Sequence, residues 1–203
     1  MKIKALLLCL TVITSATCLQ AQIQKGDLLL GATLGFNSNN NNGGNYSSSN
    51  TNLSPRVALA IGENSVLGLR TNFGYYTSKS ELSDQKSRGT TVGASAFWRR
   101  YMPIKKQLGW YLEANGGVNF YRAVSYYSNT KSKTTTTQYG ANVIPGIYYQ
   151  ALPRLLVNVD FGGLNYTHGR SKMDGAPVGK ASSINFNLLS NFTFGVDFIL
   201  GKK

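Results

Sequence analysis

The chain has 203 residues, a formal net charge of +13 at pH 7, one histidine and two cysteines. So few histidines and cysteines argue against a zinc site, which takes three or four such ligands, and we expect no metal ion and no cofactor. No stretch is apolar over the roughly 20 residues that a membrane-spanning helix needs, because Gly, Asn, Thr or a charged residue interrupts every long run.

The N-terminal segment has the parts of a secretory signal peptide. Two lysines precede an apolar run over residues 5–13, and the residues that follow are small or polar. The apolar run is too short to span a bilayer, which argues against a retained anchor. A lipid on Cys18 is disfavoured, because the preceding residues lack the usual leucine and the small residue expected at the cut. We predict a cleaved signal peptide over residues 1–22 and one exported domain over residues 23–203.

Removing this segment changes the charge and the chemistry of the chain. The formal charge falls from +13 to +11, because the segment carries Lys2 and Lys4 and no acid, and both cysteines are lost. Nucleic acid is one partner for so basic a chain, but an exported protein meets anionic lipid and lipopolysaccharide phosphate instead. We therefore expect no nucleic-acid partner. Scattered charge that only keeps the protein soluble is the alternative.

Eight segments alternate between apolar and polar residues, which is the pattern of β-strands. They cover residues 27–36, 53–61, 66–76, 90–101, 110–120, 136–150, 154–166 and 183–200. In the last segment Thr193, Gly195 and Asp197 separate large apolar residues. That apolar set is Phe192, Phe194, Val196, Phe198 and Leu200. Such a strand either buries its apolar face in a soluble protein or turns it to lipid in a transmembrane barrel.

The connections between the segments favour the barrel. Short connections alternate strictly with long polar ones. The short ones are residues 62–65, 102–107 and 151–153, and the long ones are residues 37–52, 77–89, 125–135 and 167–182. Short turns on one side and long loops on the other are typical of a membrane barrel. We predict an all-β fold, an eight-stranded antiparallel up-and-down transmembrane β-barrel, in which the apolar set of the last strand faces lipid.

Aromatic residues lie near both ends of these segments, as the two interface belts of a membrane barrel require. Near the short connections are Trp98, Tyr101, Trp110 and Tyr149. Near the long connections are Phe36, Phe73, Tyr75, Phe120, Tyr139 and Tyr166. We expect one belt at each membrane surface.

The polar faces of the segments predict the content of the lumen. Their charged residues are Arg56, Arg70, Arg99, Glu113, Asp160 and Asp197. An eight-stranded barrel is just wide enough for side chains to fill, and an unpaired charge in it is costly. Three bases and three acids therefore predict a paired network that fills the lumen. A narrow polar conduit is the alternative.

Two stretches resemble a known family. "FWRRYMPIKKQLGWYLEANGGVNF" (Phe97–Phe120) and "VIPGIYYQALPRLLVNVDFGGLNY" (Val143–Tyr166) are similar to strand–turn–strand units of the outer-membrane β-barrel domain family of Gram-negative bacteria, the small OmpA/OmpX-like, porin-family barrels. The resemblance implies the barrel fold and a place in the cell outer membrane. The tail departs from the family pattern, because Gly201 and two lysines follow Leu200 where the family often ends on an aromatic residue.

These features predict an integral outer-membrane protein with a structural, adhesion or ligand-binding role through long external loops. We expect it to be a monomer whose partners are outer-membrane lipid, lipopolysaccharide, the barrel assembly machinery and an extracellular ligand. Two of the loops are basic and could bind lipopolysaccharide phosphates or form a solvated rim. Their basic residues are Lys131, Lys133, Arg170, Lys172 and Lys180.

Two other functions are weighed against this one. A narrow porin-like channel for small or hydrophobic solutes is the alternative, which a filled lumen disfavours. A lipid-modifying outer-membrane hydrolase needs a nucleophile within reach of a base. The only histidine, His168, lies near Ser171 and Asp174 in sequence, but the spacing does not match the His and Ser pattern of the deacylase barrels. We therefore predict that the protein is not an enzyme.

Overall fold

The structure, a computed structural model, describes residues 23–41, 46–80, 85–127, 130–174 and 177–201. The predicted signal peptide and both cysteines lie outside these residues, so the signal peptide stays a prediction. Among the described residues there is no helix that is long and apolar enough to cross a membrane.

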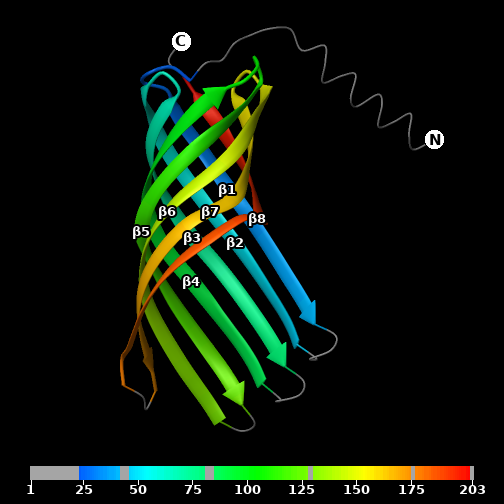
Figure 1. Cartoon of the computed structure of the whole chain (residues 1–203), viewed down its shortest axis with the longest axis vertical. Helices are drawn as coiled ribbons and strands as arrows, with labels where there is room; N and C mark the ends of the chain where they lie inside the picture. Colours follow the sequence, from blue (N-terminus) through cyan, green and yellow to red (C-terminus); the bar gives the residue numbers. More distant parts are fainter. Residues whose placement is uncertain (1–22, 42–45, 81–84, 128–129, 175–176, 202–203) are drawn as a thin grey trace, which may run out of the picture.

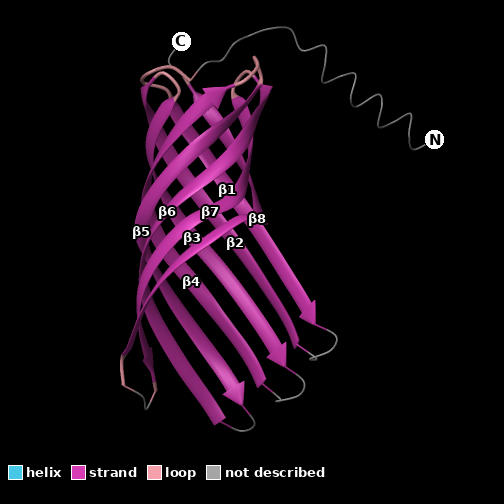
Figure 2. Cartoon of the chain, viewed as in Figure 1, coloured by secondary structure: helices cyan, strands magenta, loops and turns pink. Residues whose placement is uncertain are grey.

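Eight strands form one closed sheet (Figures 1 and 2). Neighbours in the chain pair antiparallel, and the first strand pairs with the last. The predicted eight-stranded up-and-down barrel is therefore confirmed. The strands are β1 (Leu28–Asn41), β2 (Tyr46–Gly62), β3 (Ser65–Ser80), β4 (Gln85–Pro103), β5 (Leu108–Tyr127), β6 (Thr130–Leu152), β7 (Leu155–Met173) and β8 (Gly179–Leu200).

The two ends of the barrel differ. At one end, which we call the short-turn end, the connections are residues 63–64, 104–107 and 153–154. Asn64 adopts a positive φ of 59° in the tightest of them, a conformation that Asn tolerates better than most residues. We call the opposite end, where β1 and β2 are joined, the far end.

The prediction of long loops at the far end is wrong. Most of those residues continue the strands, so that β6 has 23 residues and β8 has 22. A strand needs only about 9–11 residues to cross a bilayer, so the barrel wall extends well beyond a membrane. Most of these extensions lack apolar residues at alternate positions, as in β6 where Lys131, Lys133 and Thr135 follow one another on one face, and this removes the sequence signal for a strand. They hold together through backbone pairing and hydroxyl pairs such as Ser87–Ser125, with 2.9 Å between the Oγ atoms.

The barrel is closed along its whole length except between β1 and β8. These strands share seven residue pairs, from Leu28–Leu200 to Leu34–Phe194, whereas β1 and β2 share fourteen. Beyond Phe194 a register shift against β7 inserts three extra residues into β8, and Leu189 there has a positive φ of 63°. The far part of β8 therefore turns away from β1 (Figure 1). In the described structure, residues 35–41 pair with β2 only, residues 179–188 and Thr193 pair with β7 only, and residues 189–192 belong to neither ladder of β8.

Buried apolar side chains line the interior at the short-turn end. These side chains are Ile23, Leu29, Ala60, Val66, Tyr101, Tyr148, Leu156 and Ile199. Tyr101 and Tyr148 meet edge-to-face with ring centroids 5.2 Å apart, a favourable aromatic geometry. This apolar layer supports the charged side chains that lie next along the barrel axis.

Candidate functional site

Apolar and charged side chains are distributed in the manner of a transmembrane barrel, apolar outside and polar inside. The five residues predicted to face lipid from β8 are all exposed, and Phe194 has 62% of its surface accessible. Asp197, three residues further along, is 2% exposed inside the barrel. A soluble barrel with an apolar lumen would show the reverse arrangement.

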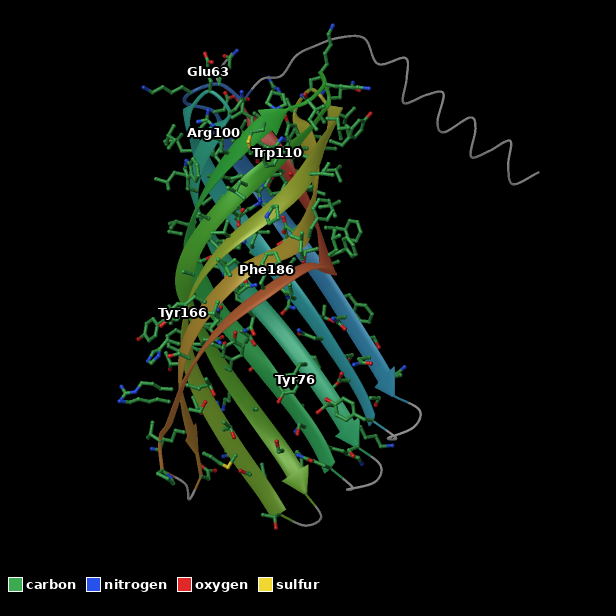
Figure 3. All side chains as sticks on the ribbon, in the orientation of Figure 1. Glu63, Tyr76, Arg100, Trp110, Tyr166 and Phe186 are labelled. Atoms are coloured by element: carbon green, nitrogen blue, oxygen red, sulfur yellow. The ribbon has the colours of Figure 1, made fainter. Side chains whose placement is uncertain are left out.

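Exposed aromatic residues lie at both levels predicted for the belts. Trp98 and Trp110 are exposed near the short-turn end, and all six residues predicted for the other belt are exposed as well. Figure 3 shows Trp110 near the short-turn end and Tyr166 closer to the middle of the molecule. Tyr101 was assigned to the wrong place, because it is 2% exposed inside the barrel. Odd positions of β4 face the lumen there, and Tyr101 shares that face with Arg99.

Five charged side chains meet in the lumen and form what we call the ionic layer: Arg56, Arg70, Arg99, Glu113 and Asp197. Arg99 lies at its centre. Its Nη2 is 2.7 Å from Oε2 of Glu113, and its Nη1 is 3.2 Å from Oδ2 of Asp197. The guanidinium also lies 4.2 Å from the ring centroid of Tyr111, within cation–π range. One buried cation thus joins two acids and an aromatic ring.

The other two arginines complete the layer from β2 and β3. Arg56 donates from Nε and Nη2 to the two carboxylate oxygens of Asp197, at 2.6 and 2.8 Å. This is the bidentate geometry that makes Arg–carboxylate pairs strong. Arg70 Nη2 lies 2.8 Å from Oε1 of Glu113, and Asn158 Nδ2 donates to Asp197 Oδ2 at 2.8 Å.

Asp160 is not part of this layer, contrary to the prediction. Among the described residues its carboxylate accepts a hydrogen bond from the Tyr111 hydroxyl and pairs with no arginine. The layer therefore holds three cations and two anions rather than an equal number. Among the described residues, Arg56 Nη1, Arg70 Nε and the acceptor Asn158 Oδ1 are buried without a hydrogen-bond partner.

Glycines make room for the layer. A Cβ atom on Gly31 would overlap Oδ1 of Asp197, and one on Gly146 would overlap the ring of Tyr111. Gly31 lies directly opposite Asp197 in the β1–β8 pairing. The absence of a side chain on β1 is thus what lets the carboxylate reach Arg56 across the seam.

The ionic layer separates two hollows of the lumen. A cavity of about 260 Å³ opens at the short-turn end, where Tyr101 and Tyr148 line it. A larger cavity of about 760 Å³ lies in the far half and is lined by residues of β1–β5. A separate cavity of about 10 Å³ lies beside Arg56, Arg99 and Asp197, with room for no more than one water molecule.

Comparison with solved structures identifies the fold. The translocator domain of the autotransporter NalP from Neisseria meningitidis aligns with 100% of this chain and 77% of its own, at a TM-score of 0.53 and 13% identity. A major outer membrane protein from Thermus thermophilus aligns over 86% of this chain and 98% of its own, at a TM-score of 0.50 and 15% identity. The fold is that of an outer-membrane β-barrel. No protein-family model and no curated protein matches the sequence.

At these identities the likeness concerns the fold alone, and the resemblance noted for two hairpins is confirmed at that level. The barrel sites described above therefore rest on their own geometry.

Basic side chains gather on the outer face of the barrel at the far end, and we call them the basic collar. Its members are Lys79, Lys86, Arg88, Arg122, Lys131, Lys133, Arg170, Lys172 and Lys180. The first four were missed in the sequence, because Lys79, Lys86 and Arg88 lie in a segment predicted as a loop and Arg122 lies just beyond the predicted end of its strand. Arg170 and Lys180 are direct cross-strand partners, and like charges in this position repel. Within the described far end, Asp174 is the one carboxylate that accompanies them.

The residues considered for a hydrolase are not brought together. His168 faces outward, where its Nδ1 lies 2.8 Å from Oγ of Ser182. Ser171 lies at an odd position of the same strand and faces inward, with its Oγ 2.8 Å from Oγ1 of Thr136. A base and a nucleophile on opposite faces of one strand cannot exchange a proton directly. Within the described residues no group of three or more metal-ligating side chains occurs either.

Proposed function

We propose that the protein is an integral protein of the Gram-negative outer membrane whose barrel conducts no solute and serves as a surface anchor and binding scaffold. The predicted signal peptide and the outward apolar face support this location. The short-turn end then lies in the periplasm, as in membrane barrels generally, and the far end projects from the cell. The barrel assembly machinery inserts it as a monomer.

The ionic layer is the observation that carries the proposal. Arg99, Glu113 and Asp197 are each at most 2% exposed, and the cavity beside Arg56, Arg99 and Asp197 has room for no more than one water molecule. Opening such a layer would separate buried ion pairs, which is strongly unfavourable. A barrel closed in this way is suited to holding its far end at the surface rather than to transport.

The basic collar supplies the contact with the membrane surface. It begins just beyond the exposed aromatic residues of the far end, since Arg122 follows Phe120 by two positions on the same outward face. Anionic headgroups attract such residues by about 1 kcal/mol each. We propose that lipopolysaccharide phosphates lie between the opposed cations of the collar, such as Arg170 and Lys180.

Single-channel conductance in a planar bilayer tests the proposal. The refolded domain is added after a heat-modifiability gel has shown that it is folded, and a general porin in the same bilayer proves that steps are detectable. We expect no discrete steps from the barrel. Reproducible steps would replace the proposal by the narrow-channel alternative.

A further inference from the structure

The larger cavity, which we call the vestibule, has a lining of unusual composition. All fourteen side chains around its roughly 760 Å³ are Asn, Ser, Thr or Tyr, and none is charged. They come from five consecutive strands, β1–β5. The volume falls within the range of small-molecule sites, about 300–1,000 Å³, but the lining is far more polar than such sites usually are.

This neutrality is confined to one face of the wall. Successive residues of a strand point to opposite faces of the sheet. Around the vestibule, the charged side chains of the described strands all lie on the outer face of the barrel. Tyr121 lines the vestibule while Arg122 is exposed outside, and Ser78 and Lys79 alternate in the same way. The vestibule is therefore an uncharged interior within the most basic part of the molecule.

The lining selects a class of ligand. An ion entering the vestibule would find no opposite charge among its lining residues, and a partly desolvated unpaired charge is costly. An acyl chain would remove water from amides and hydroxyls without replacing their hydrogen bonds. Asn amides and Ser or Thr hydroxyls both donate and accept, and Tyr rings offer flat apolar surface with a polar tip. A ligand with many hydroxyl groups and C–H faces satisfies all of these groups.

We propose that the vestibule binds a neutral oligosaccharide. Asn52, Asn72 and Asn119 line its deeper part, where Asn72 Nδ2 already bonds Asn119 Oδ1 at 3.3 Å, and Tyr76 and Tyr121 provide the ring surfaces. The inference rests on the proposed function, because the ionic layer gives the vestibule a closed floor. The lining contains no residue of β6–β8, so the vestibule is open on the side where β8 leaves β1, and a chain-like ligand can enter sideways.

Isothermal titration calorimetry of the folded domain tests this inference. The probes are glucan, galactan and N-acetylglucosamine oligomers, with a sulfated glucan as the charged counterpart. An amine-oxide detergent is needed, because glucoside and maltoside detergents would compete for a sugar site. We expect one neutral class to bind, and Tyr121→Ala to weaken that binding at least tenfold. Tyr126→Ala is the matched control, because Tyr126 packs outside on Arg88 of β4.

Additional measurements distinguish a free oligosaccharide from a glycolipid headgroup as the ligand. They also distinguish failure of the sugar site from failure of the proposed function. Vesicles that carry the same sugar as a glycolipid headgroup compete with the free oligosaccharide if the headgroup is also a ligand. Binding of the sulfated glucan alone, or of no probe by a folded sample, overturns the inference. Conductance steps that a neutral sugar blocks would instead overturn the closed floor and keep the sugar site.

Discussion

Arg99 and Glu113 face each other across β4 and β5, and Arg99 Nη2 lies 2.7 Å from Glu113 Oε2. The same arginine reaches Asp197 on the last strand, 98 positions along the chain. Arg99 therefore ties the middle of the barrel to its closing seam. Because β1 and β8 share only seven residue pairs, this side-chain bridge adds to a seam that has the shortest ladder in the barrel.

Replacing Asp197 should destabilise the barrel strongly. Asp197→Leu leaves Arg56 without its bidentate partner and removes one acceptor from Arg99. Breaking a buried pair on one side costs about 3–5 kcal/mol. We expect the folded band to be lost at a clearly lower temperature in detergent gels. Asp174→Leu, on an exposed acid at the far end, should leave that temperature unchanged; equal loss in both variants would contradict the role of the ionic layer.

The fold could be predicted from the sequence because contact with lipid requires apolar residues on the outer face of each membrane-crossing strand. Where a strand crosses the membrane, every second residue is apolar, as from Phe192 to Leu200, and the eight strands could be counted from that pattern. Beyond the membrane the rule lapses. The outward positions of β6 include Lys131 and Lys133, so the sequence looked like a loop although the ladder continues.

The site was partly accessible for a similar reason. Alternation placed Arg56, Arg99 and Asp197 on the lumen side, but it carries no information on partners. Asp160 accepts a hydrogen bond from the Tyr111 hydroxyl and pairs with none of the arginines of the ionic layer. This contact depends on the register between β5, β6 and β7, which the alternation does not give. The vestibule was missed because most of its Asn and Ser residues, such as Asn37 and Ser48, were predicted to lie in loops. Its neutral lining is recognised only when the inward residues of these strands are considered apart from the outward ones.

A methyl group on Gly31 should weaken the seam. In Gly31→Ala the new Cβ overlaps Oδ1 of Asp197 and the carbonyl oxygen of Val196, so the carboxylate or the β1–β8 ladder must move. We expect a loss of the order of 1–3 kcal/mol, as for overpacked sites, measured by urea unfolding in detergent. Gly116→Ala is the control, because its Cβ would meet only Gly140 O at 3.8 Å. Unchanged stability of Gly31→Ala would show that Asp197 has another position available.

A charge on the outer face should impair membrane insertion. Phe194 is 62% exposed near the middle of the apolar face of β8, and arginine near the bilayer midplane costs about 2–4 kcal/mol in a barrel. Phe194→Arg should therefore fold into lipid vesicles with a lower yield at equal urea concentration. Ile104→Arg changes an exposed apolar residue of a short turn and should fold normally. Normal folding of both variants would contradict the transmembrane orientation of β8.

Neutralising the collar should weaken binding to lipopolysaccharide. With Lys131, Lys133, Arg170 and Lys172 changed to Gln, each lost charge removes about 1 kcal/mol of attraction to an anionic surface. Binding of the folded protein to lipopolysaccharide micelles should fall and should depend less on salt. Lys25→Gln with Lys105→Gln removes exposed charges at the short-turn end and should change neither property. An equal loss per removed charge in this control, which removes two charges against four, would mean that net charge, and not the collar, governs binding.

Engineered disulfides should reveal where the seam opens. Without residues 1–22 the chain has no cysteine, so any cross-link comes from the introduced pair. Leu34 and Phe194 are the last partners of the β1–β8 ladder, and opposed Cα atoms about 4.5–5.5 Å apart suit a disulfide. Leu34→Cys with Phe194→Cys should therefore cross-link on mild oxidation, seen as a mobility change that a reductant reverses.

Phe36→Cys with Phe192→Cys is the control, because it would be the next outward pair if the ladder continued. Since β8 has turned away from β1 at this level, this pair should stay reduced. Efficient cross-linking of both pairs would show that the seam closes further than the seven pairs and that the vestibule has no side entrance.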